Sequence, residues 1–168
     1  FPDDRFKDPV TGRPLSGWWR RAGALLLDGL ILAIPNFIVS RIVGSAVTTT
    51  QQLCTVNGQI GLCNQYQLHA GPLVAAVVLG AIVSGIYWVL LVGGPRGQTI
   101  GMRATGIAVR DATTDTSIGR GRALVRYVVI FALGLLVVPV LIDYLSPLWD
   151  RRRQAWHDHA ADSVVVAL

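Results

Sequence analysis

The sequence predicts an all-α membrane protein with two full transmembrane helices and a third kinked or re-entrant apolar hairpin, joined by cytoplasmic interfacial segments. The chain has 168 residues, of which 52% are hydrophobic and only 15% are charged, whereas a soluble domain usually carries about 25% charged residues. Its apolar residues are gathered in long runs, as in segments that cross a bilayer. Arginines are concentrated between some of these runs and absent between others, which is the pattern that orients membrane proteins.

The first seventeen residues are polar and rich in Pro, Gly and Asp. Such a composition predicts a flexible N-terminal tail over 1–17, followed by a single membrane domain over 18–168. The tail lacks the short apolar core and the cleavage site of a signal peptide. Because the chain begins with Phe1 and not with Met, we expect a further segment upstream.

The first predicted span runs from about Ala22 to Ser40 and is interrupted by Asp28 and by Pro35-Asn36. Its roughly 19 residues match a hydrocarbon core about 30 Å thick. Pro35 predicts either a kink or freed backbone carbonyls that could bind a cation.

The second predicted span, Ala70 to Pro95, contains no charged residue, and Tyr87 and Trp88 lie near one end as interface anchors. Small residues recur at every fourth position, at Ala76, Gly80 and Ser84. Such a stripe allows another helix to approach closely, although it could also arise by chance in a chain rich in Gly and Ala.

The third apolar region, Tyr127 to Ile142, is broken by Gly134 and Pro139 and bounded by Arg126 and Asp143. It predicts either one short span or a re-entrant hairpin. The roughly 24 residues between Arg126 and Arg151 are too few for two full crossings at about 1.5 Å per residue. We therefore favour a re-entrant hairpin, whose irregular backbone must be buried in protein.

Arginine placement predicts the orientation. The loop at about 42–69 contains no Lys, Arg, Asp or Glu, whereas the loop at about 94–122 and the tail at about 148–168 carry most of the arginines. By the positive-inside rule, both termini and the second loop are cytoplasmic and the first loop is extracytoplasmic. Three full crossings would put the C-terminus outside, which again favours a hairpin that re-enters.

Cys54 and Cys63 both lie in the loop assigned to the oxidising side. We expect them to form a disulfide. Two free thiols or a metal pair are the alternatives, and no neighbouring Cys or His pair supports a metal.

Arg21 and Asp28 are seven residues apart, two helical turns, and so lie on nearly the same helix face. An acid at the depth of Asp28 must face protein or water, because charge in the bilayer costs a few kcal/mol. It is either an ion or proton site or a buried polar group that orients the helices. Asp143 is the only other intramembrane acid near enough to consider. We expect Asp158 to pair with Arg21, with the C-terminal tail folded back under the first helix.

Other chemistry finds little support in the sequence. No serine–histidine–aspartate set, nucleophile elbow or zinc-helix pattern is present, so we expect neither enzyme activity nor a cofactor. His157 and His159, two residues apart, share a face only in a strand, so we expect no metal site. Thr105, Ile107 and Val109 alternate like a short strand or an interfacial segment. The pI of about 9.9 fits anionic lipid headgroups better than nucleic acid.

Three segments in this order resemble the RDD (Arg-Asp-Asp) family of small bacterial integral membrane proteins. WWRRAGALLLDGLIL is similar to the opening helix, with its Arg and Asp at Arg21 and Asp28. GGPRGQTIGMRATGIAVRD resembles the stretch after the second helix, and RRRQAWHDHAADSVVV resembles the closing segment, with Ser163 where Thr is usual. The matching motif positions are Gly97, Gln98, Thr99, Gly101, Arg153, Gln154, His157, Asp158 and Ala161.

The resemblance implies a small protein of the bacterial inner membrane. Transport of an unidentified ligand has been suggested for the family, and some members are linked to Na⁺/H⁺ exchange. This chain is short and has few membrane acids, so a pore would need oligomerisation or a partner. We therefore expect an accessory or structural subunit of a larger membrane complex, and keep an oligomeric transporter or ion exchanger using Asp28 as the alternative.

Overall fold

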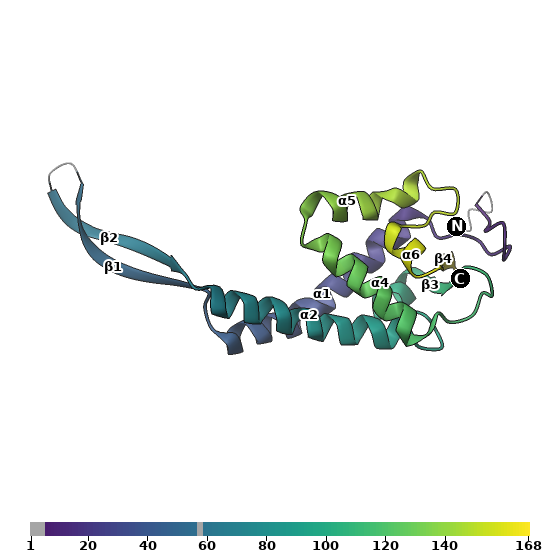
Figure 1. Ribbon diagram of the computed structural model, residues 1–168, viewed down its shortest axis with the longest axis horizontal. Helices are drawn as coiled ribbons and strands as arrows, with labels where there is room; N and C mark the ends of the chain where they lie inside the picture. Colours follow the sequence, from purple (N-terminus) through teal and green to yellow (C-terminus); the bar gives the residue numbers. More distant parts are fainter. Residues whose placement is uncertain (1–5, 57–58) are drawn as a thin grey trace. The chain divides into compact units, whose positions relative to one another are not determined.

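The computed structural model describes residues 6–56 and 59–168 (Figure 1). Its contacts divide the chain into two compact units, Phe1–Leu32 with Ser84–Leu168 and Ala33–Val83. In chain order the elements are α1 (Trp18–Val43), β1 (Val47–Val56), β2 (Gln59–Leu68), α2 (Ala70–Val92), α3 (Ile100–Thr105), β3 (Ile107–Asp111), α4 (Gly119–Gly134), α5 (Val137–Leu145), the 3₁₀ turn η1 (Ser146–Leu148), α6 (Trp156–Ala160) and β4 (Ser163–Ala167).

Two helices, α1 and α2, are long and apolar enough to cross a membrane. Only 11% of the most apolar window of α1 and 6% of that of α2 is buried inside the protein, whereas the core helix of a soluble domain is mostly buried. Side chains such as Leu26, Leu30 and Ile34 are about two-thirds exposed. The helix α1 continues through Pro35 to Val43, so this proline does not end it.

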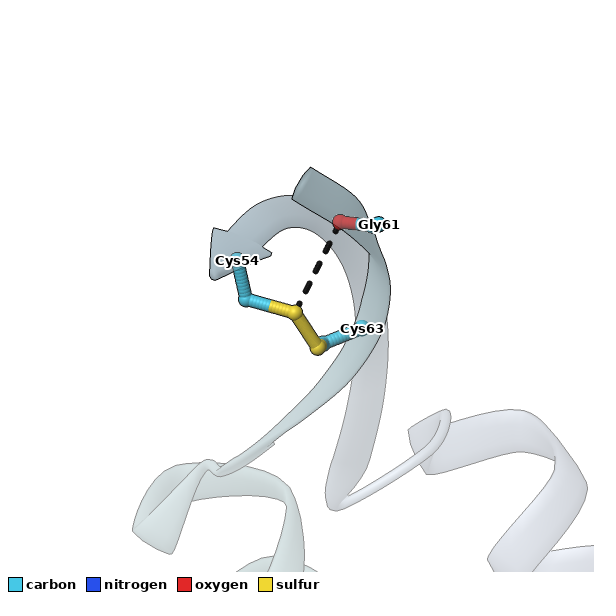
Figure 2. Close-up of a disulfide and its surroundings, with 3 residues drawn as sticks. All are labelled: Cys54, Gly61 and Cys63. Atoms are coloured by element: carbon cyan, nitrogen blue, oxygen red, sulfur yellow. Dashed lines mark hydrogen bonds between the residues drawn. A yellow bond between two sulfur atoms is a disulfide. The ribbon is translucent and has the colours of Figure 1, made fainter. Parts of the chain in front are cut away.

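The smaller unit contains the antiparallel hairpin of β1 and β2, paired from Val47↔Leu68 to Val56↔Gln59. The predicted disulfide between Cys54 and Cys63 is present. Figure 2 shows the two cysteines joined across the strands, with the Gly61 carbonyl oxygen 3.6 Å from the Cys54 sulfur.

The register of this hairpin separates its side chains into two faces, because directly opposed residues lie on the same side of a sheet. One face carries the larger apolar residues, all well exposed: Val47, Leu53, Ile60, Leu62, Tyr66 and Leu68. The other face carries threonines, glutamines and both cysteines. The uncharged loop is therefore an amphipathic ribbon.

The small-residue stripe of α2 contacts the chain's own helices. A Cβ at Gly80 would come within 2.6 Å of the Asn36 side-chain oxygen, and one at Gly85 within 2.9 Å of the Tyr127 ring. At Gly80, therefore, the stripe packs against α1 of the same chain.

The larger unit has a core built on the antiparallel pair β3–β4, in register from Ile107↔Ala167 to Asp111↔Ser163. Val109 and Val165 are fully buried in it, with Val92 of α2. Ile107 and Val109 of the predicted alternation thus lie in a strand, whereas Thr105 is the last residue of α3.

The expectation of an all-α fold is wrong, because the structure contains two small antiparallel sheets besides its helices. The local signal for these strands is weak for a physical reason. β3 has only 5 residues and its partner β4 lies beyond α6, while the hairpin has no buried face and mixes Thr and Gln with its apolar residues.

The flexible-tail expectation is also corrected for part of residues 1–17. Leu15 is 4% exposed and pairs with Val166, while the Ser16 amide donates to the Val165 carbonyl over 2.9 Å. This segment therefore extends the β3–β4 sheet and belongs to the larger unit.

The third apolar region forms a helical hairpin of α4 and α5 (Figure 1). Of the two expected breaks, the one at Gly134 is present, because α4 ends there and Leu136 is extended, whereas Pro139 lies inside α5. Pro139 is the third residue of α5. Backbone N–H groups in the first turn of a helix have no partner within the helix, so the N–H that proline lacks is not needed there. With 9 residues, α5 is about 14 Å long and too short to cross a bilayer.

Candidate functional site

Asp28 is buried in α1, at 1% exposure, and accepts three hydrogen bonds. The Tyr87 hydroxyl of α2 donates to Oδ1 over 2.6 Å, and the Gly101 amide donates to the same oxygen over 2.8 Å. The Thr99 hydroxyl donates to Oδ2 over 2.5 Å. All three donors are uncharged, so the carboxylate is held by dipoles that belong to the chain itself.

The segment Gly97–Gly101 is shaped to reach Asp28. Thr99 is the N-cap of α3, where its hydroxyl accepts from the Met102 amide while donating to Asp28. Gly101 has no room for a side chain, because a Cβ there would lie 2.3 Å from the Ala24 carbonyl oxygen. This close approach lets the Gly101 amide donate to the carboxylate.

Two further motif residues fasten this segment to β3. Gly97 has a φ of 61°, and a Cβ there would lie 2.3 Å from the Val109 carbonyl oxygen. The Gln98 side chain donates to the Ile107 carbonyl over 2.8 Å. The four motif positions therefore position one loop between Asp28 and the sheet.

A second polar cluster surrounds Asp158 of α6, which is fully buried. Arg21 of α1 donates to its Oδ2 over 2.8 Å, and Arg126 of α4 donates to Oδ1. The Ala155 amide donates to Oδ2 as well, over 3.0 Å. The expected pair of Arg21 with Asp158 is thus present, and the tail does return to the first turn of α1.

His157 links this cluster to α5. Its Nδ1 lies 2.6 Å from Oδ2 of Asp143, and its backbone amide donates to Oδ1 over 3.1 Å. Its Nε2 lies 3.5 Å from Asp158. The two ends of the α4–α5 hairpin, at Arg126 and Asp143, therefore meet at neighbouring residues of α6.

The remaining motif residues of the tail support these contacts. The Arg153 carbonyl accepts from Arg21 over 2.5 Å, and the Arg153 guanidinium lies over the Phe6 ring. The buried Gln154 side chain donates to the Ser163 carbonyl over 2.9 Å, which ties the turn to β4.

The pKa directions outside the spanning helices follow from burial and charge. Burial alone would raise the pKa of Asp158, but the positive charges of Arg126 and Arg21 hold it well below its ordinary value. Burial, and then Arg126, lower the pKa of His157, which keeps this imidazole neutral.

Arg21 and Asp28 share a helix but not a site. Asp28 is bonded to α2 and to the 97–101 segment, whereas Arg21 is bonded to the tail. The sequence alone did not identify Tyr87, Arg126 or Asp143 as members of these clusters. Arg126 and Asp143 flank the third apolar run, and their isolation at its two ends was the available signal.

Metal-ligand geometry is absent from the described residues, in which no three His, Cys, Asp or Glu side chains gather as a ligand set. His157 faces Asp143 inside the protein, whereas the exposed His159 lies 3.6 Å from Asp150.

Two apolar helices with little internal burial, joined near one end by buried polar clusters, are the architecture of a small helical membrane protein. The chain belongs to the RDD family, whose sequence profile matches residues 15–162. No curated protein and no solved structure matches the chain.

Proposed function

We propose that this protein is an accessory or structural subunit of a larger complex in the bacterial inner membrane and has no enzyme activity of its own. The observation that carries the proposal is that three donors of the same chain are hydrogen-bonded to Asp28. A carboxylate held in this way joins α1, α2 and α3, and an entering ion would have to displace those donors.

The exposed surface supports a partner. The apolar windows of α1 and α2 are largely unburied by the chain itself, so lipid or another protein must cover them. The stripe on α2 does not serve this contact at Gly80, where Asn36 fills the space. We therefore place the partner against the outward faces of the two spans, around exposed residues such as Leu30.

The proposed orientation has both termini in the cytoplasm and the disulfide-bonded hairpin outside. Contacts of Arg21, Arg126 and Asp143 with α6 support it, because they bring the start of α1, both ends of the α4–α5 hairpin and the tail together. Arg96, Arg103 and Arg120 are exposed, and in this orientation they face anionic headgroups on the cytoplasmic side.

Site-specific photocrosslinking in native membranes tests the subunit role. A photoreactive residue replacing Leu30, which is 70% exposed, should give one discrete higher-mass adduct, whereas the same group at Ala24, 3% exposed, should give none. Native electrophoresis in mild detergent should show the Leu30 adduct within a large complex. A monomer with no adduct at any outward position of α1 or α2 would contradict the proposal.

The alternative function is ion exchange through Asp28, which is favoured by one observation: an ionisable group lies within a predicted span. Purified protein in liposomes should then move Na⁺ or H⁺, and Asp28→Asn should abolish the flux while the protein stays folded. An inactive wild-type protein that still forms the complex would favour the subunit role.

A further inference from the structure

A cavity of about 100 Å³ lies in the larger unit beside the Asp158 cluster. Its lining comes from α1, α2, α4 and the tail, and most of it is apolar, including Trp18, Leu25, Trp88, Met102 and Ile130. A single water needs roughly 10–15 Å³ of such volume. The cavity is therefore large enough for a small organic ligand.

The same cavity is lined by two arginines, the half-buried Arg21 and the buried Arg126. Their terminal nitrogens are used by Asp158, the Arg153 carbonyl and Ser163. The Nε of each is buried and has no acceptor among the described residues. A buried N–H without an acceptor destabilises the folded protein, so an acceptor in the cavity would stabilise both side chains.

The charges around the cavity favour an anion as that acceptor. Arg21 and Arg126 line the cavity, and no acid is among its lining residues. The carboxylates of Asp158 and Asp143 are outside the lining and are bonded to the two arginines and to His157. The neighbouring wall of Trp18, Trp88 and Ile130 can take a hydrocarbon group.

We propose that this cavity binds an amphipathic carboxylate, with the head on the Arg21 and Arg126 Nε–H groups and the chain against the two tryptophans. Such a ligand has two sources, a short-chain acid in solution or a fatty acid from the bilayer. The site is independent of the proposed subunit role, which assigns the protein no ligand.

Bromine-labelled probes test the site, because bromine quenches a tryptophan that it touches. The full chain in phosphatidylcholine nanodiscs should show saturable quenching by 6-bromohexanoate, at least tenfold tighter than by the uncharged 6-bromohexanol. A second arm uses 16-bromohexadecanoate in the bilayer: saturable quenching by the long acid alone assigns the source to the membrane, and by the short acid to solution.

A substitution that fills the cavity tests where the probe binds. Ala22→Leu adds bulk on the cavity wall without touching the arginine pairs, and it should weaken binding at least tenfold. Ala33→Leu, at an exposed position of the same helix, should leave binding unchanged. Arg126→Lys retains a positive charge but removes the Nε–H, and should weaken the carboxylate more than the alcohol.

Any of three results would overturn the site. They are the absence of saturable quenching by either acid, equal affinity for the short acid and the alcohol, and unchanged binding in a folded Ala22→Leu protein. The crosslinking experiment at Leu30 has a separate readout, so failure of one proposal is distinguishable from failure of the other.

Discussion

At the scale of single residues, the protein treats its buried charges in two ways. Asp28 is bonded by uncharged donors, whereas Asp158 is bonded by two guanidinium groups. Removing a donor from a buried carboxylate leaves it with an unmet hydrogen-bonding need, which costs more than the bond contributes. Both clusters should therefore respond strongly to small changes.

Replacement of Thr99 by Val tests the Asp28 cluster. It removes the hydroxyl that both donates to Asp28 and caps α3, and we expect a loss of about 2–4 kcal/mol in unfolding free energy. Thermal unfolding in detergent measures the change. Thr114→Val, at an exposed threonine, is the matched control and should shift the midpoint little.

His157 predicts a pH dependence of stability. The folded protein holds this imidazole neutral with its pKa lowered, by burial first and then by Arg126, while the unfolded chain takes up a proton near pH 6.5. Stability is therefore complete above about pH 6.5 and falls as the pH is lowered below it, by at most about 1.4 kcal/mol per pH unit.

Midpoints of thermal unfolding between about pH 7.5 and 5.5 check this sign. His157→Gln should flatten the dependence, and His159→Gln, at a histidine side chain that is 54% exposed, should leave it unchanged. A dependence of the same size in the His157 variant would assign the titration to another group.

At the scale of elements, glycines decide how closely the 97–101 segment approaches α1. A Cβ at Gly101 would lie 2.3 Å from the Ala24 carbonyl oxygen. The backbone of Gly101 cannot move away from Ala24 without breaking the hydrogen bond from its amide to Asp28. The short helix α3 is thus placed by sterics and by one carboxylate together.

Gly101→Ala should therefore destabilise the protein by several kcal/mol, as overpacking against a fixed backbone does, or prevent its accumulation in the membrane. Gly121→Ala in α4 has open space around its Cβ and should raise stability by up to about 1 kcal/mol through helix propensity. Equal midpoints for the two variants in detergent would contradict this account.

At the scale of the whole molecule, the tail and the two ends of the α4–α5 hairpin meet at α6, which contacts the first turn of α1. In a bilayer this contact requires the N-terminal end of α1 and the C-terminus to lie on one side. In the proposed topology α1 and α2 are the two crossings, and α4–α5 enters and leaves by the same side.

Accessibility of single cysteines to an impermeant thiol reagent in intact cells tests this topology. In a chain with Cys54 and Cys63 replaced by Ser, a cysteine at Gln65 should be labelled from outside, and one at Thr114 or Leu168 only after the membrane is opened. Labelling of the Leu168 cysteine in intact cells would require a third full crossing and would contradict the hairpin.

The sequence by itself determined the two long helices, the cysteine pair, the family and the partnership of Arg21 with Asp158. These depend on local properties: the length of an apolar run, the positions of rare polar residues within it, and ordered motifs. Arginine placement also predicted the α4–α5 hairpin. Arginines precede and follow an apolar run that is too short to cross the bilayer twice, which favours a chain that enters and leaves by the same side.

Only the tertiary structure decided the β3–β4 sheet, the partners of Asp28 and the cavity, where two arginine Nε–H groups have no acceptor among the described residues. Asp28 bonds to residues 59 and 71 positions away, and β4 bonds to a strand from before α4. The local sequence pattern does not predict such distant pairs, because several hydroxyl groups could bond to Asp28 and several strands could pair with β3. Which of them reaches the buried acid is set by close backbone approaches, such as that at Gly101, that exist only once the chain has folded.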